Sequence, residues 1–204
     1  MGDFRVDLKK LSAIASGGRS PGLREWAVLW ILNSELHCVA AYRWGRLADA
    51  VHVRHPLAGL PLVISHRVWN RWNTTLHHCD IDRRANIGPG LLIMHRHGVL
   101  IGPVVIGANG VIHHNVTIGQ RVGGGDQGVP RIGRNVWIGP AATITGAITI
   151  GDGATISAGA VVSRDIPPRS LVAGNPGRVI ASDYDNSSMI NFHMPGPVGE
   201  TALE

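Results

Sequence analysis

Cysteine is scarce in this sequence: only Cys38 and Cys79 occur among 204 residues, far apart and in unlike contexts. Such a pair predicts neither a disulfide framework nor a metal site. Long apolar runs are also missing, since the longest, WAVLWIL and PLAGLPLVI, are too short to cross a bilayer. The N-terminus lacks the charged and then apolar pattern that directs secretion. We therefore expect a soluble, cytoplasmic protein with no membrane span and no bound metal.

Acidic residues are outnumbered, and the imbalance is uneven along the chain. The formal net charge is +5, whereas residues 182–204 contain four Asp or Glu and no Lys or Arg. A basic body favours an anionic partner. Nucleic acid would require a concentrated Lys/Arg stripe with interleaved aromatics, and residues 80–165 contain none. The charge therefore predicts a phosphate-bearing small molecule and no nucleic acid.

A six-residue repeat runs through residues 80–165. An Ile or Val recurs at each repeat, with a one-residue slip and one longer gap, and glycine often follows it. The repeated residues are Ile87, Ile93, Val99, Ile106, Ile112, Ile118, Ile132, Ile138, Ile144, Ile150, Ile156 and Val162. A helix repeats its apolar face near 3.6 residues and a strand near 2, so this period fits neither. It predicts a parallel β-solenoid whose triangular coils of roughly eighteen residues point each branched side chain inwards.

The residues before the repeat predict a small α-helical cap. The helical pattern begins at Leu23, the segment Asn33-Ser34-Glu35 is expected to break it and to supply the N-cap of a second helix, and a third helix is expected from Pro56 to about Trp72. Five of the six tryptophans lie in this region. Their helical spacing favours packing against the solenoid or a neighbouring subunit over a ligand or membrane-edge surface.

Two further segments depart from the repeat. The gap between Ile118 and Ile132 contains three consecutive glycines and is two residues longer than two repeats, so a loop should leave the prism there and contact substrate. Residues 182–204 are small and polar, which predicts a flexible or weakly docked tail. We thus expect a helical cap over residues 1–79, a β-helix over 80–181 and a tail over 182–204.

The segments CDID, GLLIMHRHGVLIG and AGNPGRVI resemble those of the hexapeptide-repeat acyltransferases, and within them the serine acetyltransferases. The short Trp- and Arg-rich cap also resembles that of exopolysaccharide O-acetyltransferases. The resemblance implies a left-handed β-helix, an exception to the usual right-handed crossover. It also places the catalytic histidine at His95 and its carboxylate partner at Asp80, beneath it on the neighbouring rung. A neutral imidazole would take the proton of an alcohol as the alcohol attacks a thioester, and the carboxylate would fix the tautomer.

His114 is the next candidate. It follows its repeat isoleucine by two residues, as His95 does, so the two are expected on equivalent faces of adjacent coils. His114 would bind the acceptor or share the role of base. His97 and His113 are expected to be ordinary surface or corner residues.

The resemblance weakens where the acceptor would bind. In serine acetyltransferases an aspartate precedes the catalytic histidine, and the glycine-rich loop ends in an Arg-His pair. Here these positions are Met94, Gly128 and Val129. Met94 and Val129 are therefore predicted acceptor contacts without the charges that an amino acid requires. A sugar or another alcohol becomes at least as good a candidate as serine.

Acetyl-CoA is the donor that the resemblance implies, lying in a groove between adjacent prisms. Pro140, Ala158 and Gly159 match positions where small residues face it, although Pro140 has no amide hydrogen to donate. Arg164 and Arg178 would meet its phosphates, with a solvated surface as the alternative role. The shared groove favours a homotrimer, alone or stacked as two trimers.

These features predict an acetyl-CoA-dependent O-acetyltransferase that acts directly on a serine-like amino acid or another small alcohol. One alternative is a sugar, polysaccharide or natural-product O-acetyltransferase, and another is a non-catalytic trimeric scaffold. Zinc-dependent carbonic anhydrases share the repeat but have a short His-to-His spacing that this sequence lacks.

Overall fold

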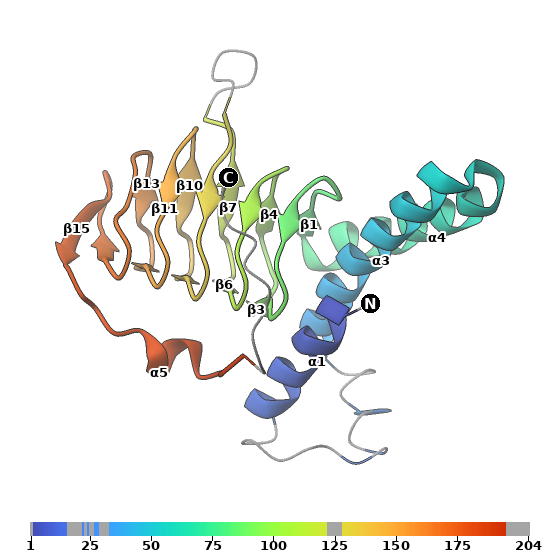
Figure 1. Ribbon diagram of the computed structural model, residues 1–204, viewed down its shortest axis with the longest axis horizontal. Coiled ribbons are helices and arrows are strands. Elements are labelled where there is room, and N and C mark those ends of the chain that lie inside the picture. Colours follow the sequence, from blue (N-terminus) through green and yellow to red (C-terminus); the bar gives the residue numbers. More distant parts are fainter. Residues whose placement is uncertain are drawn as a thin grey trace.

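The computed structural model describes residues 2–15, 22, 24, 27–28, 33–121 and 128–194. They form a parallel β-helix with an N-terminal group of helices at one end (Figure 1). The helices are α1 (Gly2–Ala15), α3 (Ser34–Arg54), α4 (Pro56–His77) and α5 (Ser187–Ile190). The strands are β1 (Cys79–Ile81), β2 (Asn86–Ile87), β3 (Leu92–Met94), β4 (Val99–Ile101), β5 (Val105–Ile106), β6 (Val111–His113), β7 (Thr117–Gly119), β8 (Arg131–Ile132), β9 (Trp137–Ile138), β10 (Thr143–Thr145), β11 (Thr149–Ile150), β12 (Thr155–Ile156), β13 (Val161–Val162), β14 (Leu171–Ala173) and β15 (Arg178–Ala181). The predicted solenoid with a helical cap is confirmed.

Three sheets form the sides of the prism, and from β1 to β13 each takes every third strand. Sheet A has the order β1-β4-β7-β10-β13, sheet B the order β11-β8-β5-β2, and sheet C the order β15-β14-β12-β9-β6-β3. The neighbouring strands are parallel except for β14 and β15, which are antiparallel. A chain that visits the three sheets in turn therefore makes one coil for every three strands.

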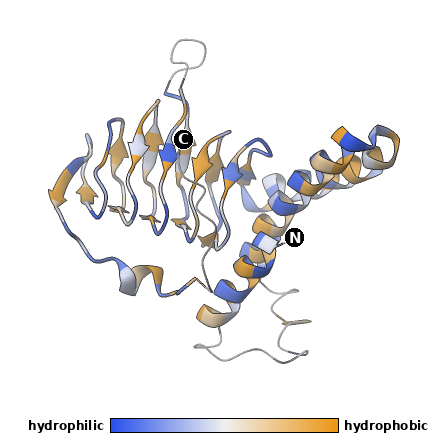
Figure 2. Cartoon of the chain, viewed as in Figure 1, coloured by the Kyte–Doolittle hydropathy of each residue, from blue (hydrophilic) through white to orange (hydrophobic). Residues whose placement is uncertain are grey.

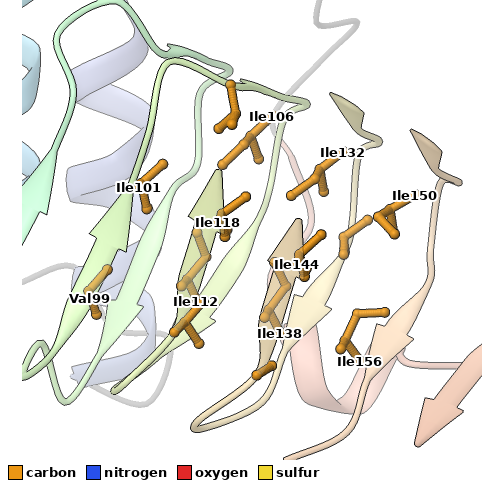
Figure 3. Packing of buried hydrophobic residues seen from close by; sticks show 14 of the residues in the cluster. Val99, Ile101, Ile106, Ile112, Ile118, Ile132, Ile138, Ile144, Ile150 and Ile156 are labelled. Atoms are coloured by element: carbon orange, nitrogen blue, oxygen red, sulfur yellow. The ribbon is translucent and has the colours of Figure 1, made fainter. Parts of the chain in front are cut away.

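The repeated Ile and Val side chains form the core of the prism. All twelve lie on strands and are at most 3% exposed, and ten residues of this core, drawn from successive coils, are labelled in Figure 3. Figure 2 shows that hydrophobic residues return on the strands of each coil. Full burial of one such side chain contributes about 1.5–3 kcal/mol. The one-residue slip is the sum of two departures: Ile101, the residue of β4 that pairs with Ile118, lies eight positions after Ile93, and Ile106 of β5 lies only five positions after Ile101.

The longer gap is a single repeat with an insertion. β7 of sheet A leads directly to β8 of sheet B, which is the next side of the prism. The 14 positions from Ile118 to Ile132 are therefore one six-residue repeat plus eight residues, and not two repeats plus two. Residues 122–127 of this predicted loop lie outside the described residues.

The cap is built on an antiparallel pair of long helices, α3 and α4, that projects from the β1 end of the solenoid (Figure 1). The N-cap predicted in the segment 33–35 is Asn33, whose side chain accepts a hydrogen bond from the amide of Leu36 at 3.0 Å. α4 begins at Pro56 as expected and extends to His77. Trp72 is 61% exposed, so it does not pack against the solenoid of its own chain. Trp26 and Trp30 lie outside the described residues, and none of the described helices is long and apolar enough to span a membrane.

Replacing Asn33 with alanine should lower the free energy of unfolding by about 1 kcal/mol, because an amide in the first turn of α3 loses its acceptor. Urea unfolding followed by circular dichroism measures this difference. Asn33→Asp keeps an acceptor in place and should retain most of the stability. An equal loss in both variants would contradict the capping role.

Helix α1 lies before the point where the sequence predicted helix, and it is anchored by buried charges. Asp7 accepts hydrogen bonds from the amides of Gly90 (2.7 Å) and Leu91 (2.8 Å) and from Arg43 Nε (2.8 Å). Arg43 of α3 also donates to the carbonyls of residues 87 and 88. Asp7 is 2% exposed, and burial raises the pKa of its carboxyl despite these donors. α1 and α3 are thereby fixed to the first coil.

The C-terminal segment, expected to be flexible or weakly docked, is docked over residues 182–194. The Asn186 side chain donates to the carbonyls of Asn135 (2.9 Å) and Gly153 (3.2 Å). Ile190 is 4% exposed and joins an apolar cluster with Leu11, Leu92 and other residues of α1, α3 and sheet C. The segment passes along sheet C towards α1 in Figure 1. Residues 195–204 lie outside the described part.

The two cysteines, distant in sequence, are neighbours in the core. Both are buried free thiols, Cys38 on α3 and Cys79 on β1. A hydrogen bond with Cys38, together with burial, raises the pKa of the Cys79 thiol. The pair therefore acts as apolar packing between the cap and the first coil.

Candidate active site

The candidate site lies at the corner where the chain turns from sheet C into sheet A. Backbone hydrogen bonds join this turn in successive coils through Asn115 N to His97 O (2.7 Å), Ala141 N to His114 O (3.0 Å) and Gly159 N to Pro140 O (2.8 Å). His97, His114 and Pro140 therefore occupy the same position in three coils, and Ala158 follows in the fourth. We call these four residues the corner column.

His95 was expected to stack on His114, but the register is different. His97 is four positions after Ile93, whereas His114 is two positions after Ile112, so the first corner contains two additional residues, His95 and Arg96. His95 also has a φ of 54°, in the left-handed region. Such a conformation costs about 1 kcal/mol or more in a residue other than glycine.

Three histidine rings nevertheless meet at this corner. The centroid of the His95 ring is 5.9 Å from that of His114 and 6.4 Å from that of His113. The rings of His113 and His114 are 6.4 Å apart, and Trp137 lies 4.9 Å from His113. His95 is exposed, whereas His113 and His114 are half-buried. We call His95, His113 and His114 the histidine cluster.

The surroundings of His113 favour its neutral form. Burial lowers the pKa of His113, and the neighbouring His114 and His95 lower it further. His114 Nδ1 is buried and has no hydrogen-bond partner within the described part of the chain. A neutral imidazole has one nitrogen that can accept a proton. The cluster can therefore perform base chemistry.

Among the described residues, no group of three or more His, Cys, Asp or Glu side chains is placed to hold a metal ion.

Asp80 is not joined to His95. It lies on β1 in register with Leu100 of β4, and its carboxylate accepts a hydrogen bond from Asn70 Nδ2 of α4 at 3.3 Å. In the described structure no hydrogen bond or ion pair connects Asp80 with His95. The reason is register: β1 pairs with β4, the strand that follows the corner, and not with the corner itself.

The predicted acceptor residues separate into two groups. His114 belongs to the histidine cluster, but Met94 packs with Leu92 and Val111 beneath α1, and Val129 packs against the core of the prism. Gly128 is also confined, since a Cβ there would lie 2.0 Å from Ala147 Cβ. Met94 and Val129 therefore act mainly as packing residues.

The predicted donor residues lie further along the same corner. Pro140 and Ala158 belong to the corner column, and Gly159 follows. The Gly159 amide already donates to the carbonyl of Pro140, so that amide is not available to a ligand. Ala158 is exposed, and its amide has no partner among the described residues. Arg164 and Arg178 are both exposed on later coils.

Sequence reasoning missed three residues of this site: His113, Trp137 and Arg96. His113 was expected to be an ordinary corner residue. Strand alternation gives the missing signal, because His113 and Trp137 each adjoin a buried isoleucine and so face outwards on adjacent strands of sheet C. For Arg96, no pattern in the sequence indicates which side chains it contacts.

The chain matches known proteins over the same region. Residues 130–164 match the family model "Bacterial transferase hexapeptide (six repeats)". Serine acetyltransferase 2 of Arabidopsis thaliana is 37% identical over 57% of this chain and 40% of its own length. The chain thus spans about half or less of the length of such curated relatives.

Solved structures extend the likeness to the cap. A Brucella abortus serine acetyltransferase in complex with coenzyme A is 26% identical, with a TM-score of 0.70 over 89% of this chain and 67% of that one. A Neisseria gonorrhoeae serine acetyltransferase in complex with serine is 30% identical, with a TM-score of 0.68 over 88% of this chain and 68% of that one. Together with the repeat and the corner histidines, this likeness shows that the chain belongs to the serine acetyltransferase family.

Proposed function

We propose that this protein is an acetyl-CoA-dependent O-acetyltransferase whose base is His95. The neutral imidazole removes the proton of the acceptor hydroxyl as its oxygen attacks the thioester carbonyl. The tetrahedral adduct then collapses, the C–S bond breaks, and the imidazolium returns the proton to the departing thiolate. The products are an acetyl ester and the free thiol of CoA, with no covalent enzyme intermediate.

The observation that supports this proposal best is the exposed His95 at a corner shared with two other histidines. One of these, His113, has a lowered pKa, so the corner does not favour accumulated positive charge before reaction. The coenzyme A complex of the Brucella relative supports the donor. We propose Asp80 as the carboxylate that orients His95, because its CDID segment resembles that of serine acetyltransferases. To act, Asp80 must give up its hydrogen bond with Asn70 and form one with His95.

Two acceptor classes follow from different observations. The serine complex of the Neisseria relative supports L-serine or a similar amino acid. The residue types of Met94 and Val129 support an uncharged acceptor, such as a sugar, because neither supplies a charge for an ammonium or a carboxylate. We place L-serine first, since family membership is the stronger argument.

We further propose that the chain forms a homotrimer. An apolar row on α4, formed by Leu57, Ile64, Val68 and Trp72, is 51–90% exposed in the single chain. Apolar rows of this kind on soluble proteins mark interfaces. Light scattering after size exclusion gives the mass that distinguishes a trimer from a monomer or a stack of two trimers.

Thiol release from acetyl-CoA by the purified protein tests the activity. L-serine, homoserine, simple sugars and a no-acceptor control should be compared, with mass spectrometry of the product. Turnover with L-serine supports the first acceptor, and turnover with sugars alone supports the second. A folded protein that releases thiol with none of these acceptors would favour the non-catalytic scaffold.

A further inference from the structure

The corner that carries His95 differs from the same corner in the later coils in the contacts that support it. Its two additional residues lengthen the turn, and the left-handed backbone at His95 needs support from its neighbours. On one side Met94 packs with residues of α1 and sheet C. On the other side Arg96 turns away from the solenoid towards the helical cap.

Arg96 is held by both long helices of the cap. Its Nη2 donates to Nδ1 of His77, at the end of α4, at 2.9 Å. Its Nη1 lies 3.9 Å from Oε1 of Glu35, in the first turn of α3. The side chain is only 17% exposed, and its Nε is buried without a hydrogen-bond partner in the described part of the chain. A guanidinium held in this way has little freedom to move.

The contact also defines the state of His77. Arginine can only donate, so Nδ1 of His77 must accept and its proton must be on Nε2. Burial and the adjacent guanidinium both lower the pKa of His77, which agrees with a neutral ring. The partners of Arg96 are thus one neutral imidazole and one carboxylate, and both belong to the cap.

We propose that Arg96 is a positioning residue that fixes His95 for catalysis by attaching the enlarged corner to α3 and α4. With Met94 and Arg96 both held by the cap, the exposed ring of His95 between them is aimed at His113 and His114. The cap thereby takes part in the site although none of its side chains belongs to the histidine cluster. This inference rests on the proposed function, because it concerns the base of that reaction.

The first test is kinetic. Arg96→Met keeps the aliphatic stem and removes the guanidinium, and it should lower kcat by about 10²-fold, the cost of a base misplaced by about 1 Å. KM for acetyl-CoA should change little, because Arg96 is turned away from the corner column. Arg96→Lys should lose less, and ethylguanidinium added to Arg96→Ala should restore part of kcat. The matched control is Arg84→Met, which removes an exposed guanidinium paired with Asp82.

Several outcomes would overturn the proposal. An unchanged kcat would show that His95 keeps its position without Arg96. A raised KM for acetyl-CoA with an unchanged kcat would instead show that Arg96 contacts acetyl-CoA. If Arg96→Met fails to fold, Glu35→Gln and His77→Phe each remove one partner and should lower kcat by a smaller factor. Wild-type kcat in both would also refute the proposal.

A spectroscopic test separates this inference from the proposed function. The ring signal of His95 in the unliganded protein can be identified by its loss in His95→Gln. In Arg96→Met that signal should shift or broaden, whereas Arg84→Met should leave it unchanged. If the wild-type protein acetylates no alcohol, the proposed function fails, yet this signal still shows whether Arg96 positions His95. A His95 signal identical in wild type and Arg96→Met would overturn the positioning role.

Discussion

Replacing His95 with glutamine should reduce acetyl transfer by about 10²- to 10⁴-fold, the usual contribution of a positioned general base. Glutamine retains a hydrogen-bonding side chain but cannot accept the hydroxyl proton at neutral pH. KM for acetyl-CoA should change little, because the predicted donor residues lie on later coils. The measurement is the rate of thiol release at saturating donor and acceptor.

His97 provides the matched control for this substitution. It lies two residues away at the same corner, is exposed, and is not one of the clustered rings. His97→Gln should therefore keep near wild-type turnover. Full activity in His95→Gln would exclude His95 as the base. If His114→Gln instead gives the larger loss, the base role belongs to His114.

Replacing Lys10 with methionine should lower the free energy of unfolding by about 3 kcal/mol, because three buried acceptors lose their hydrogen-bond donor. Lys10 is 0% exposed. Its ammonium donates to Gly90 O (2.9 Å), Asn109 Oδ1 (2.8 Å) and Gly110 O (3.3 Å). Methionine fills similar space but leaves these three buried acceptors without a donor.

The same residue makes stability depend on pH. Burial lowers the pKa of Lys10 to about 7 in the folded protein, from 10.5 in the unfolded chain, and the Asp7 carboxylate opposes this shift. Between these two values the unfolded chain binds more protons than the folded protein. The Lys10 contribution to the free energy of unfolding therefore rises with pH from about 7 to 10.5, by at most about 1.4 kcal/mol per pH unit.

Urea unfolding of wild type and Lys10→Met at pH 7, 8 and 9 measures both effects. The deficit of Lys10→Met should be present at pH 7 and should grow as the pH rises. Lys9→Met is the control, because Lys9 is the exposed neighbour of Lys10 on α1. A deficit no larger than that of Lys9→Met would show that the buried Lys10 side chain does not anchor α1.

Local patterns identified some of the site, and tertiary contacts supplied the rest. His95 could be named because a recognisable segment surrounds it, and His114 because it follows a repeat isoleucine. Strand alternation would have placed His113 and Trp137 on the outer face of sheet C, but the contacts of His113 with Trp137 and with His95 depend on how the coils stack. Arg96 could not be named, because its partners come from the cap. The expected Asp80–His95 pair illustrates the same limit, since spacing alone does not reveal which strand β1 joins or that Asn70 would meet its carboxylate.

The sequence by itself determined the solenoid, since the inside of a narrow prism accepts only apolar, branched side chains at fixed intervals and those intervals are visible in one dimension. Asn33 was visible for a similar reason, because a helix cap depends on residues a few positions apart. Only the tertiary structure decided that α1 and residues 182–194 cover sheet C, that the first corner is two residues longer, and that Arg96 joins it to the cap. Those features depend on contacts between residues distant in sequence, and burial of a charge such as Lys10 is favourable only when such partners surround it.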